Sequence, residues 1–484
     1  MDKKRGADVK NSILVNYIYN ILYQILLMIL PLITTPYISR VLGADAIGAY
    51  SYTQSITYYF TLIGCFGLNL YGQREVAYVQ NDQNKRSQVF WEIVCIRFIT
   101  HLVSLIAFCV TFVHHKKYAV LFTIQIIDIV ASFIDVSWFF QGMEDFKRIV
   151  VRNIVIKLAA VVAIFVFVKK PKDIIIYAFI YSLSLLVGNL IMILYLPRLI
   201  IKHKIRGVDA LKHIKPCLVL FLPQIASSIY NVLDKTMIGA LTGIEAEVAF
   251  YEQAQKIVKV ALSFLTSVGT VMLPRIAVVF ARKDYVAIKR YLEKSFRFVF
   301  FLGIPLSLGM ISTARFLVPW FYGDGFEKVA PNILVIAPVI LIVGLSNVIG
   351  VQYLLPTGKQ NDYFISVLCG SMMNIVLNIV LIPRLLSLGA AIASIIAELF
   401  VLTAQIFMTR KDFDFKYIFK DSIKYFLSGI LMAGCIFFET GFLTSSIKSS
   451  IIQILTGVIV YFFMLVLMKD ALIREILGKI MRKI

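Results

Sequence analysis

Charged side chains stand inside long apolar runs of this sequence, where a charge is costly to keep. Among the basic residues within such runs, we single out Arg97, Lys157, Lys235, Lys256 and Lys259. A charge at the centre of a bilayer costs about 3 kcal/mol on insertion scales, so such residues normally face a bundle interior or a water-filled cavity. There they can bind phosphate, and arginine does so with a planar fork of donors.

Arg97 lies deep in its run, about 15 Å from the start at 1.5 Å per residue. Lys259 is similarly deep, whereas Lys235 is nearer the end of its run and can reach the interface. We therefore expect Arg97, together with Lys256 and Lys259, to contact an anionic cargo. The alternative is a purely structural ion pair, which predicts that Arg97→Ala lowers protein abundance.

Carboxylates and other polar side chains accompany these cations at helical spacing. The deep acids that we expect to line a polar cavity or to couple transport to an ion are Asp128, Asp135, Asp234 and Glu398. One helical face carries Gln125, Asp128, Ser132 and Asp135, and another carries Gln224, Ser227, Ser228, Asn231, Asp234 and Lys235. Stripes of this kind predict a polar lumen. The alternative is interhelical polar contacts without a path.

The composition is that of an integral membrane protein, because 59% of the 484 residues are hydrophobic and 16% are charged. The apolar runs are long and continuous, which indicates helices rather than the alternating strands of a barrel. We explain the net charge of +21 by basic cytoplasmic loops that face anionic lipid head groups, and not by binding of nucleic acid. The five histidines and six cysteines have no metal-ligand spacing, and we expect no cofactor.

The runs predict an all-α protein with fourteen transmembrane helices. Their expected limits are 12–38, 47–71, 87–113, 118–140, 149–168, 174–197, 216–241, 248–273, 296–313, 329–355, 362–383, 386–408, 421–439 and 449–468. Lys and Arg concentrate in alternate connections, which places both termini and the loops 198–215 and 274–295 in the cytoplasm. Segments 114–117 and 239–247 are then external, and Lys169, Lys170 and Lys172 are exceptions to the bias.

A repeat relates residues 24–50 to residues 224–250, at an offset of 200 positions. Both segments enter from the same side, so the repeat is parallel and predicts two six-helix lobes with a substrate path between them. We expect an N-terminal lobe over 1–200, a C-terminal lobe over 201–415 and a terminal helix pair with a basic tail over 416–484. Chance matching in an apolar alphabet is the alternative.

Four stretches resemble the O-antigen and capsule type of polysaccharide flippases, in the multidrug/oligosaccharidyl-lipid/polysaccharide exporter superfamily. They are Pro36 to Gly43 with Gly48 to Tyr52, Trp138 to Phe146, Asp234 to Gly239, and Leu381 to Arg384 with Gly389 to Ala393. The stretch from Trp138 to Phe146 is the most specific of them, and the resemblance covers nearly the whole chain.

The resemblance implies two six-helix lobes around a cavity, plus a terminal pair, in the inner (cytoplasmic) membrane. The cargo would be an isoprenoid-diphosphate-linked oligosaccharide, moved between leaflets by alternating access without any bond being made. Membrane lipids, a polysaccharide polymerase and assembly proteins are the implied partners. An ion gradient would be coupled through Asp128, Asp135 or Glu398.

Three alternatives remain open at this level. A multidrug antiporter of the same superfamily would favour a lumen with acids and aromatics and fewer cations, and the stretch from Trp138 to Phe146 argues against it. A membrane-embedded polysaccharide polymerase or ligase typically has a large outward loop, whereas the longest one here, 314–328, is short. A peptidoglycan-precursor flippase is the third.

Overall fold

The computed structural model describes residues 2–203, 210–470 and 472–474, and side chains from residue 29 onward except those of 222–224, 226–231 and 270. Every regular element among these residues is helical, and the helices fall into two compact units, Met1–Thr236 and Met237–Ile484. The predicted division at residues 200 and 415 stays a prediction.

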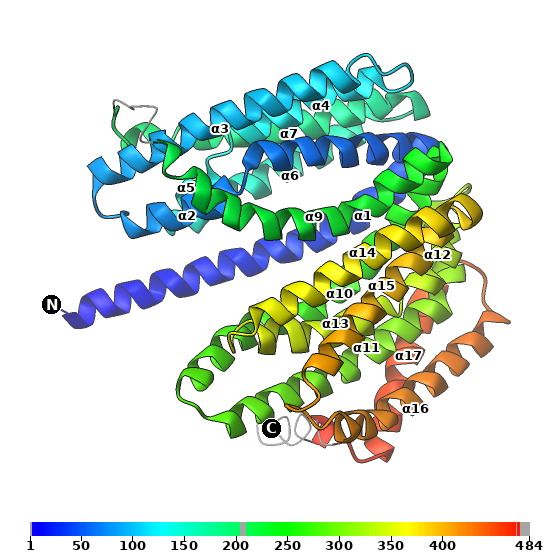
Figure 1. Cartoon of the computed structure of the whole chain (residues 1–484). Coiled ribbons are helices and arrows are strands. Elements are labelled where there is room, and N and C mark those ends of the chain that lie inside the picture. The colour runs from blue at the N-terminus through cyan, green and yellow to red at the C-terminus, as the bar shows by residue number, and fades with distance from the viewer. Residues whose placement is uncertain (1, 204–209, 471, 475–484) are drawn as a thin grey trace. The chain divides into compact units, whose positions relative to one another are not determined.

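Unit 1 contains the first half of the helices (Figure 1). They are α1 (Asp2–Cys65), α2 (Leu68–Tyr78), α3 (Gln83–Phe112), α4 (Ala119–Phe133), α5 (Ser137–Gly142), α6 (Phe146–Phe167), the 3-10 turn η1 (Pro171–Asp173), α7 (Ile174–Ile193), the 3-10 turn η2 (Leu196–Arg198) and the greater part of α9 (Ile214–Thr242). Helix α1 is kinked at Gly43, where φ is 77°. The left-handed conformation costs glycine little, so the kink joins two predicted spans in one element.

Unit 2 contains the remaining helices and the terminal pair (Figure 1). They are α10 (Glu245–Ala281), α11 (Tyr285–Tyr322), α12 (Val329–Ile336), α13 (Val339–Ile349), the π-helical turn η3 (Gly350–Leu354), α14 (Gln360–Leu385), α15 (Ser387–Met408), α16 (Phe415–Thr440) and α17 (Ile447–Leu467). Helices α16 and α17 pack against each other and against α11.

Eleven helical segments in the described part of the chain are long and apolar enough to cross a membrane. Their apolar side chains are often exposed, as with Val110 (76%), Leu194 (76%) and Phe438 (73%), which suits contact with lipid rather than water. The all-helical membrane class is therefore confirmed. The count of fourteen stays a prediction, and the stripe residues Gln224, Ser227, Ser228 and Asn231 lie outside the described side chains.

Two of the predicted spans are broken helices. The expected helix over 118–140 stops at Phe133 and resumes at Ser137, and the one over 329–355 is interrupted between Ile336 and Val339 and ends in a π-helical turn. A broken span frees backbone groups that need partners away from water. The break between α4 and α5 contains Asp135, which lines the candidate site.

Candidate functional site

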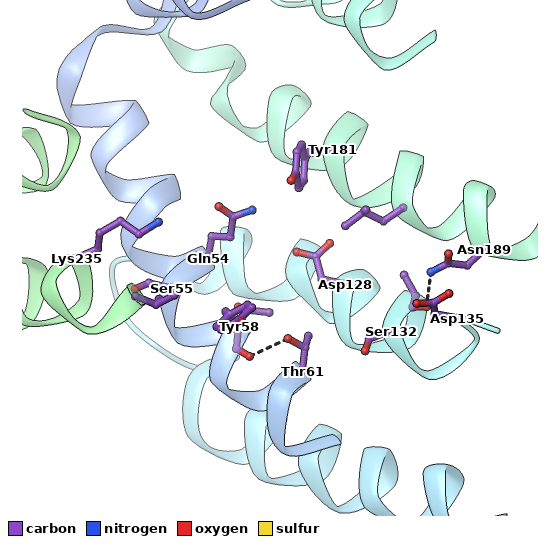
Figure 2. Close-up of a pocket in the computed structure, with 14 residues that line it drawn as sticks. Gln54, Ser55, Tyr58, Thr61, Asp128, Ser132, Asp135, Tyr181, Asn189 and Lys235 are labelled. Carbon is purple, nitrogen blue, oxygen red and sulfur yellow. Dashed lines mark hydrogen bonds between the residues drawn. The ribbon is translucent and has the colours of Figure 1, made fainter. Parts of the chain in front are cut away.

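A polar pocket of about 430 Å³ lies within unit 1, between α1, α4, α7 and the described part of α9. Figure 2 shows Gln54, Asp128 and Tyr181 around this space, with Lys235 on the side of α9. Its volume falls within the roughly 300–1,000 Å³ that ligand pockets occupy. The structure thus brings together three of the charged residues predicted from the sequence, namely Asp128, Asp135 and Lys235.

Asp128 lies on α4 and is 8% exposed. Its Oδ1 atom is buried and has no hydrogen-bond partner among the described residues. The Asp128 carboxyl also interacts with the side chain of Ser182 on α7. A buried carboxylate oxygen that has no hydrogen bond is costly, so Oδ1 favours the arrival of a proton, a cation or a donor from a ligand.

Asp135 occupies the break between α4 and α5. Its Oδ1 accepts a hydrogen bond from the backbone N–H of Ser137 at 2.9 Å, which satisfies a donor at the start of α5. The break therefore turns a second carboxylate toward the pocket that Asp128 lines. A continuous helix would have left neither the exposed N–H nor this position for Asp135.

Arg97 does not line the pocket but secures the helix beside it. The side chain is 1% exposed, and its Nε donates to the carbonyl oxygen of Phe133 at 3.0 Å. One Nη donates to Asn69 Oδ1 at 2.7 Å, and the other donates to the carbonyl oxygen of Ser132. A cation on the last carbonyls of a helix satisfies acceptors that have no partner within that helix.

Side chains near Arg97 make further hydrogen bonds at the end of α4. His101 Nδ1 is 2.9 Å from the carbonyl oxygen of Arg97, and His101 Nε2 is 3.2 Å from Ser132 Oγ. Cys65 Sγ, at the end of α1, is also 3.2 Å from Ser132 Oγ. The end of α4 is thus bonded to α1 and α3 directly and to α2 through Arg97. We infer that Arg97 has a structural role, which is to hold this end of α4 in place.

The remaining predicted residues occupy other places. Lys157 on α6 is half-buried and has no hydrogen bond or ion pair with a described residue. Lys256 pairs with Glu252 at 3.1 Å, one turn away on α10, and Lys259 is exposed. Asp234 is 5% exposed on α9, and Glu398 is half-buried on α15. Their functional roles stay predictions.

Sequence reasoning missed Asn189, Tyr58 and Tyr181 of the pocket lining, and it missed Arg152, which bonds to Asn189. Arg152 Nη1 on α6 donates to Asn189 Oδ1 at 2.7 Å, and Asn189 Nδ2 donates to the carbonyl oxygen of Ala131 at 2.7 Å. These two hydrogen bonds connect α6 to α7 and α7 to α4 beside the pocket. A polar Asn189 within an apolar run was the available signal. Among the described residues, no group of three His, Cys, Asp or Glu side chains is placed to hold a metal ion.

Comparison with known families gives two matches. The family model described as "Polysaccharide biosynthesis protein" matches residues 13–280, which is more than half of the chain. A second model, described as "MatE", matches residues 220–380.

Relatives and solved structures agree with the first match. A "Putative O-antigen transporter" of Escherichia coli (strain K12) is 25% identical over 416 residues, covering 83% of this chain and 98% of that protein. A second protein with this description, from Shigella dysenteriae, is 24% identical over 338 residues and covers 68% of this chain and 83% of its own. The fold is similar to that of "Lipid II flippase MurJ, inward closed conformation", with a TM-score of 0.75, 17% identity, and coverage of 95% of this chain and 100% of the other.

Proposed function

The chain belongs to the family of polysaccharide biosynthesis proteins, and from that membership we propose that it translocates an isoprenoid-diphosphate-linked oligosaccharide repeat unit. The chain is a transporter, not an enzyme, like the named relatives. The direction proposed is from the cytoplasmic to the outer leaflet, for the synthesis of a surface polysaccharide of the O-antigen or capsule type. The observation that carries this proposal is the alignment with a "Putative O-antigen transporter" over 98% of that protein.

The proposed architecture has fourteen spans in two six-helix lobes plus a terminal pair, with both termini in the cytoplasm. Alternating access would come from rocking of the two lobes around the cargo. Support comes from the parallel repeat, from the Lys and Arg bias of the connections, and from a broken fourth span in each half of the chain.

Within this proposal, individual charged residues have the following roles. The Lys235 ammonium attracts the diphosphate as the cargo leaves water, with Lys157, Lys256 and Lys259 as further contacts along the path. Asp128 and Asp135 are the proposed coupling carboxylates, with Asp234 and Glu398 as additional acids of the path. Because Arg97 is buried against backbone carbonyls, we place the diphosphate at Lys235 and give Arg97 the task of holding α4.

A multidrug antiporter is the second candidate, and two observations favour it. The "MatE" model matches residues 220–380. The pocket of unit 1 also combines two acids, Asp128 and Asp135, and two tyrosines, Tyr58 and Tyr181, with a single lysine. Acids and aromatic rings suit an organic cation better than a diphosphate.

Removal of the chain from cells that carry its polysaccharide pathway separates the two candidates. A flippase predicts that surface polysaccharide disappears while the lipid-linked repeat unit accumulates on the cytoplasmic side. Re-expression of the wild-type chain should reverse both changes. An antiporter predicts unchanged polysaccharide and increased sensitivity to cationic drugs, and that outcome would reject the flippase.

A further inference from the structure

A second pocket in unit 1, of about 580 Å³, lies between the second half of α2 and the end of α5. Its polar lining is Gln73, Arg74, Gln141 and Glu144, and its apolar lining includes Leu70 and Phe146. The stretch from Trp138 to Phe146, the most specific motif of the sequence, therefore forms one wall of a pocket. The role described above for the first pocket uses none of these residues.

Two glycines bring the walls of this pocket into contact. A Cβ atom on Gly72 of α2 would lie 2.5 Å from Trp138 Cε3, and one on Gly142 of α5 would lie 2.6 Å from the carbonyl oxygen of Gln73. Neither distance is tolerable, so both positions require glycine for α2 and α5 to approach this closely. The Trp138 ring is itself stacked on Phe90 at 5.6 Å and is 1% exposed. The motif therefore builds a rigid wall.

Glu144 is held in an unusual backbone conformation at the rim. Its φ is 57°, in the left-handed region that non-glycine residues rarely adopt, and its N–H donates to the carbonyl oxygen of Gln141 at 3.0 Å. Such conformations persist where the surrounding structure enforces them, and they gather at ligand sites. Glycine would adopt this conformation without strain. We therefore infer that the Glu144 side chain has a function at this position.

The chemistry of the lining fits a sugar better than a phosphate. Arg74 already donates to Glu75 Oε1 through Nε at 3.2 Å and through Nη2 at 2.9 Å, so its charge is compensated. The Glu144 carboxylate would repel an anion. Two glutamine amides, each with donors and an acceptor, match hydroxyl groups that also donate and accept. Leu70 and Phe146 offer apolar surface to the C–H faces of a sugar ring.

We propose that this pocket binds sugar residues of the lipid-linked oligosaccharide before translocation. The inference rests on the proposed function, and it adds a site at which the sugar part of the cargo, rather than its diphosphate, is recognised. The Lys and Arg bias of the loops places this end of α2 and α5 on the cytoplasmic side, where the cargo begins its path.

Binding of the free repeat unit tests the site without requiring transport. The probe is the oligosaccharide released by mild acid from the lipid-linked intermediate that accumulates in cells lacking the chain. It is titrated calorimetrically into the full chain in lipid nanodiscs. The wild type should bind saturably, and the double variant Gln73→Ala/Gln141→Ala should bind roughly five- to tenfold more weakly, because several hydrogen bonds are lost.

Matched variants separate recognition from folding. Gln80→Ala changes a glutamine just beyond α2 that does not line the pocket, and its binding should equal that of the wild type. Gln141→Glu keeps the size of the side chain but removes both amide donors, so it should weaken binding while leaving the melting temperature unchanged. Absence of saturable binding to the wild type, or equal binding by the double variant, would overturn the proposal.

A second arm identifies the source of the sugar and separates this proposal from the one it rests on. If nucleotide-activated sugars bind more tightly than the repeat unit, the pocket does not recognise the cargo and the inference fails. If the repeat unit is translocated in vesicles equally well by the wild type and the double variant, the function stands and the sugar site fails. If the wild type translocates no lipid-linked cargo, the proposed function fails, and the inference fails with it.

Discussion

Helix α3 of unit 1 and helix α11 of unit 2 each carry an arginine that is bonded to a neighbouring helix, and the two arginines have different partners. Arg97 lies on α3 and Arg297 on α11, 200 residues apart in the sequence. Arg97 is 1% exposed and bonded to backbone carbonyls of α4. The Arg297 side chain is 29% exposed, and its Nε lies 3.1 Å from Asp421 Oδ2 on α16.

The difference follows from what each half must hold. The break after α4 follows Phe133 and is stabilised by a guanidinium from a neighbouring helix. In unit 2, the corresponding break falls at Pro338, which has no N–H and ends the hydrogen-bond ladder by itself. Arg297 is then available to dock the terminal pair, which the first half of the chain lacks. The presence of an arginine on an apolar helix therefore does not by itself indicate which role that arginine has.

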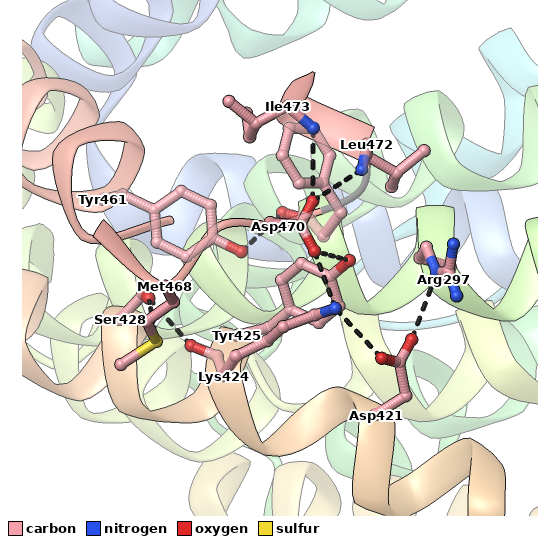
Figure 3. A network of polar contacts seen from close by, with 11 residues as sticks. Arg297, Asp421, Lys424, Tyr425, Ser428, Tyr461, Met468, Asp470, Leu472 and Ile473 are labelled. Atoms are coloured by element: carbon pink, nitrogen blue, oxygen red, sulfur yellow. Dashed lines mark hydrogen bonds and ion pairs between the residues drawn. The ribbon is translucent and has the colours of Figure 1, made fainter. Parts of the chain in front are cut away.

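Figure 3 shows the network in which Arg297 takes part. Asp421 also lies 3.0 Å from Lys424 Nζ, and Lys424 lies 2.8 Å from Asp470, just after α17. Asp470 accepts a further bond from the Tyr425 hydroxyl at 2.9 Å. The charges at this end of unit 2 therefore join α11, α16 and the segment after α17.

The largest expected effect belongs to Arg97→Ala. Removing the guanidinium leaves the carbonyl of Phe133 without its donor, leaves that of Ser132 with a backbone donor, the N–H of Asp135, and opens a cavity, which should together cost about 3 kcal/mol of stability. The melting temperature in detergent and the abundance in the membrane should both fall. Arg97→Lys should recover only part of the loss, because an ammonium cannot reproduce the fork.

Arg297→Ala is the matched control for this change. A variant Arg97→Ala that accumulates and melts like the wild type, yet exports no polysaccharide, would contradict the structural role. That result would support the contact between Arg97 and the diphosphate that the sequence predicts, and it would remove the difference in role between Arg97 and Arg297.

Asp470→Asn should have the next largest effect, about 1–2 kcal/mol, because the carboxylate is 1% exposed and bonded to a lysine. Burial opposes ionisation of Asp470, but Lys424, Tyr425 and the N–H of Ile473 outweigh it and hold its pKa below the usual range. Its contribution is therefore present above the unfolded pKa of about 3.9 and is lost as the pH falls through the folded value. Thermal melts from pH 7 to pH 3 should show this loss.

The Asp470→Asn variant is also the control for the loss of stability at low pH. The part of the acid destabilisation that comes from Asp470 should be absent in Asp470→Asn, and the difference in stability between the two proteins should shrink below about pH 4. An unchanged difference across this range would mean that the carboxylate does not contribute through its charge.

Arg297→Ala should have the smallest effect, at most about 1 kcal/mol, because the pair with Asp421 is partly exposed. Hydrogen exchange should increase in α16 and leave α13 unchanged, because the pair holds the terminal helices and not the break. A double-mutant cycle with Asp421→Asn should show that the two effects are not additive. Faster exchange at α13 would contradict the division of roles.

The sequence predicted the spans better than their interruptions. Apolar runs define α3, α6 and α7 because lipid requires long apolar helices. The break near Pro338 had a local signal, whereas the break after Phe133 had none, because a guanidinium from α3 stabilises it and that contact is tertiary. Periodicity alone does not show where an interior arginine points.

The same limit applied to the pocket of unit 1. Asp128, Asp135 and Lys235 stood out as charges in apolar runs, and the structure places them at one pocket. Gln54, Tyr58 and Tyr181 did not stand out, because they carry no charge and the pocket that they share is formed by tertiary contacts. Likewise, the glycines at 72 and 142 show their purpose only once α2 and α5 are in contact.

Translocation by purified protein in vesicles tests most directly whether charge in this pocket serves the cargo. The substrate is the lipid-linked repeat unit, and its appearance in the opposite leaflet is measured for the wild type and for Lys235→Ala at equal amounts of folded protein. The wild type should move the cargo, and Lys235→Ala should be at least about tenfold slower, since a charge-assisted contact contributes about 1.5–3 kcal/mol. Equal rates for the two proteins, or no movement by the wild type, would contradict the account.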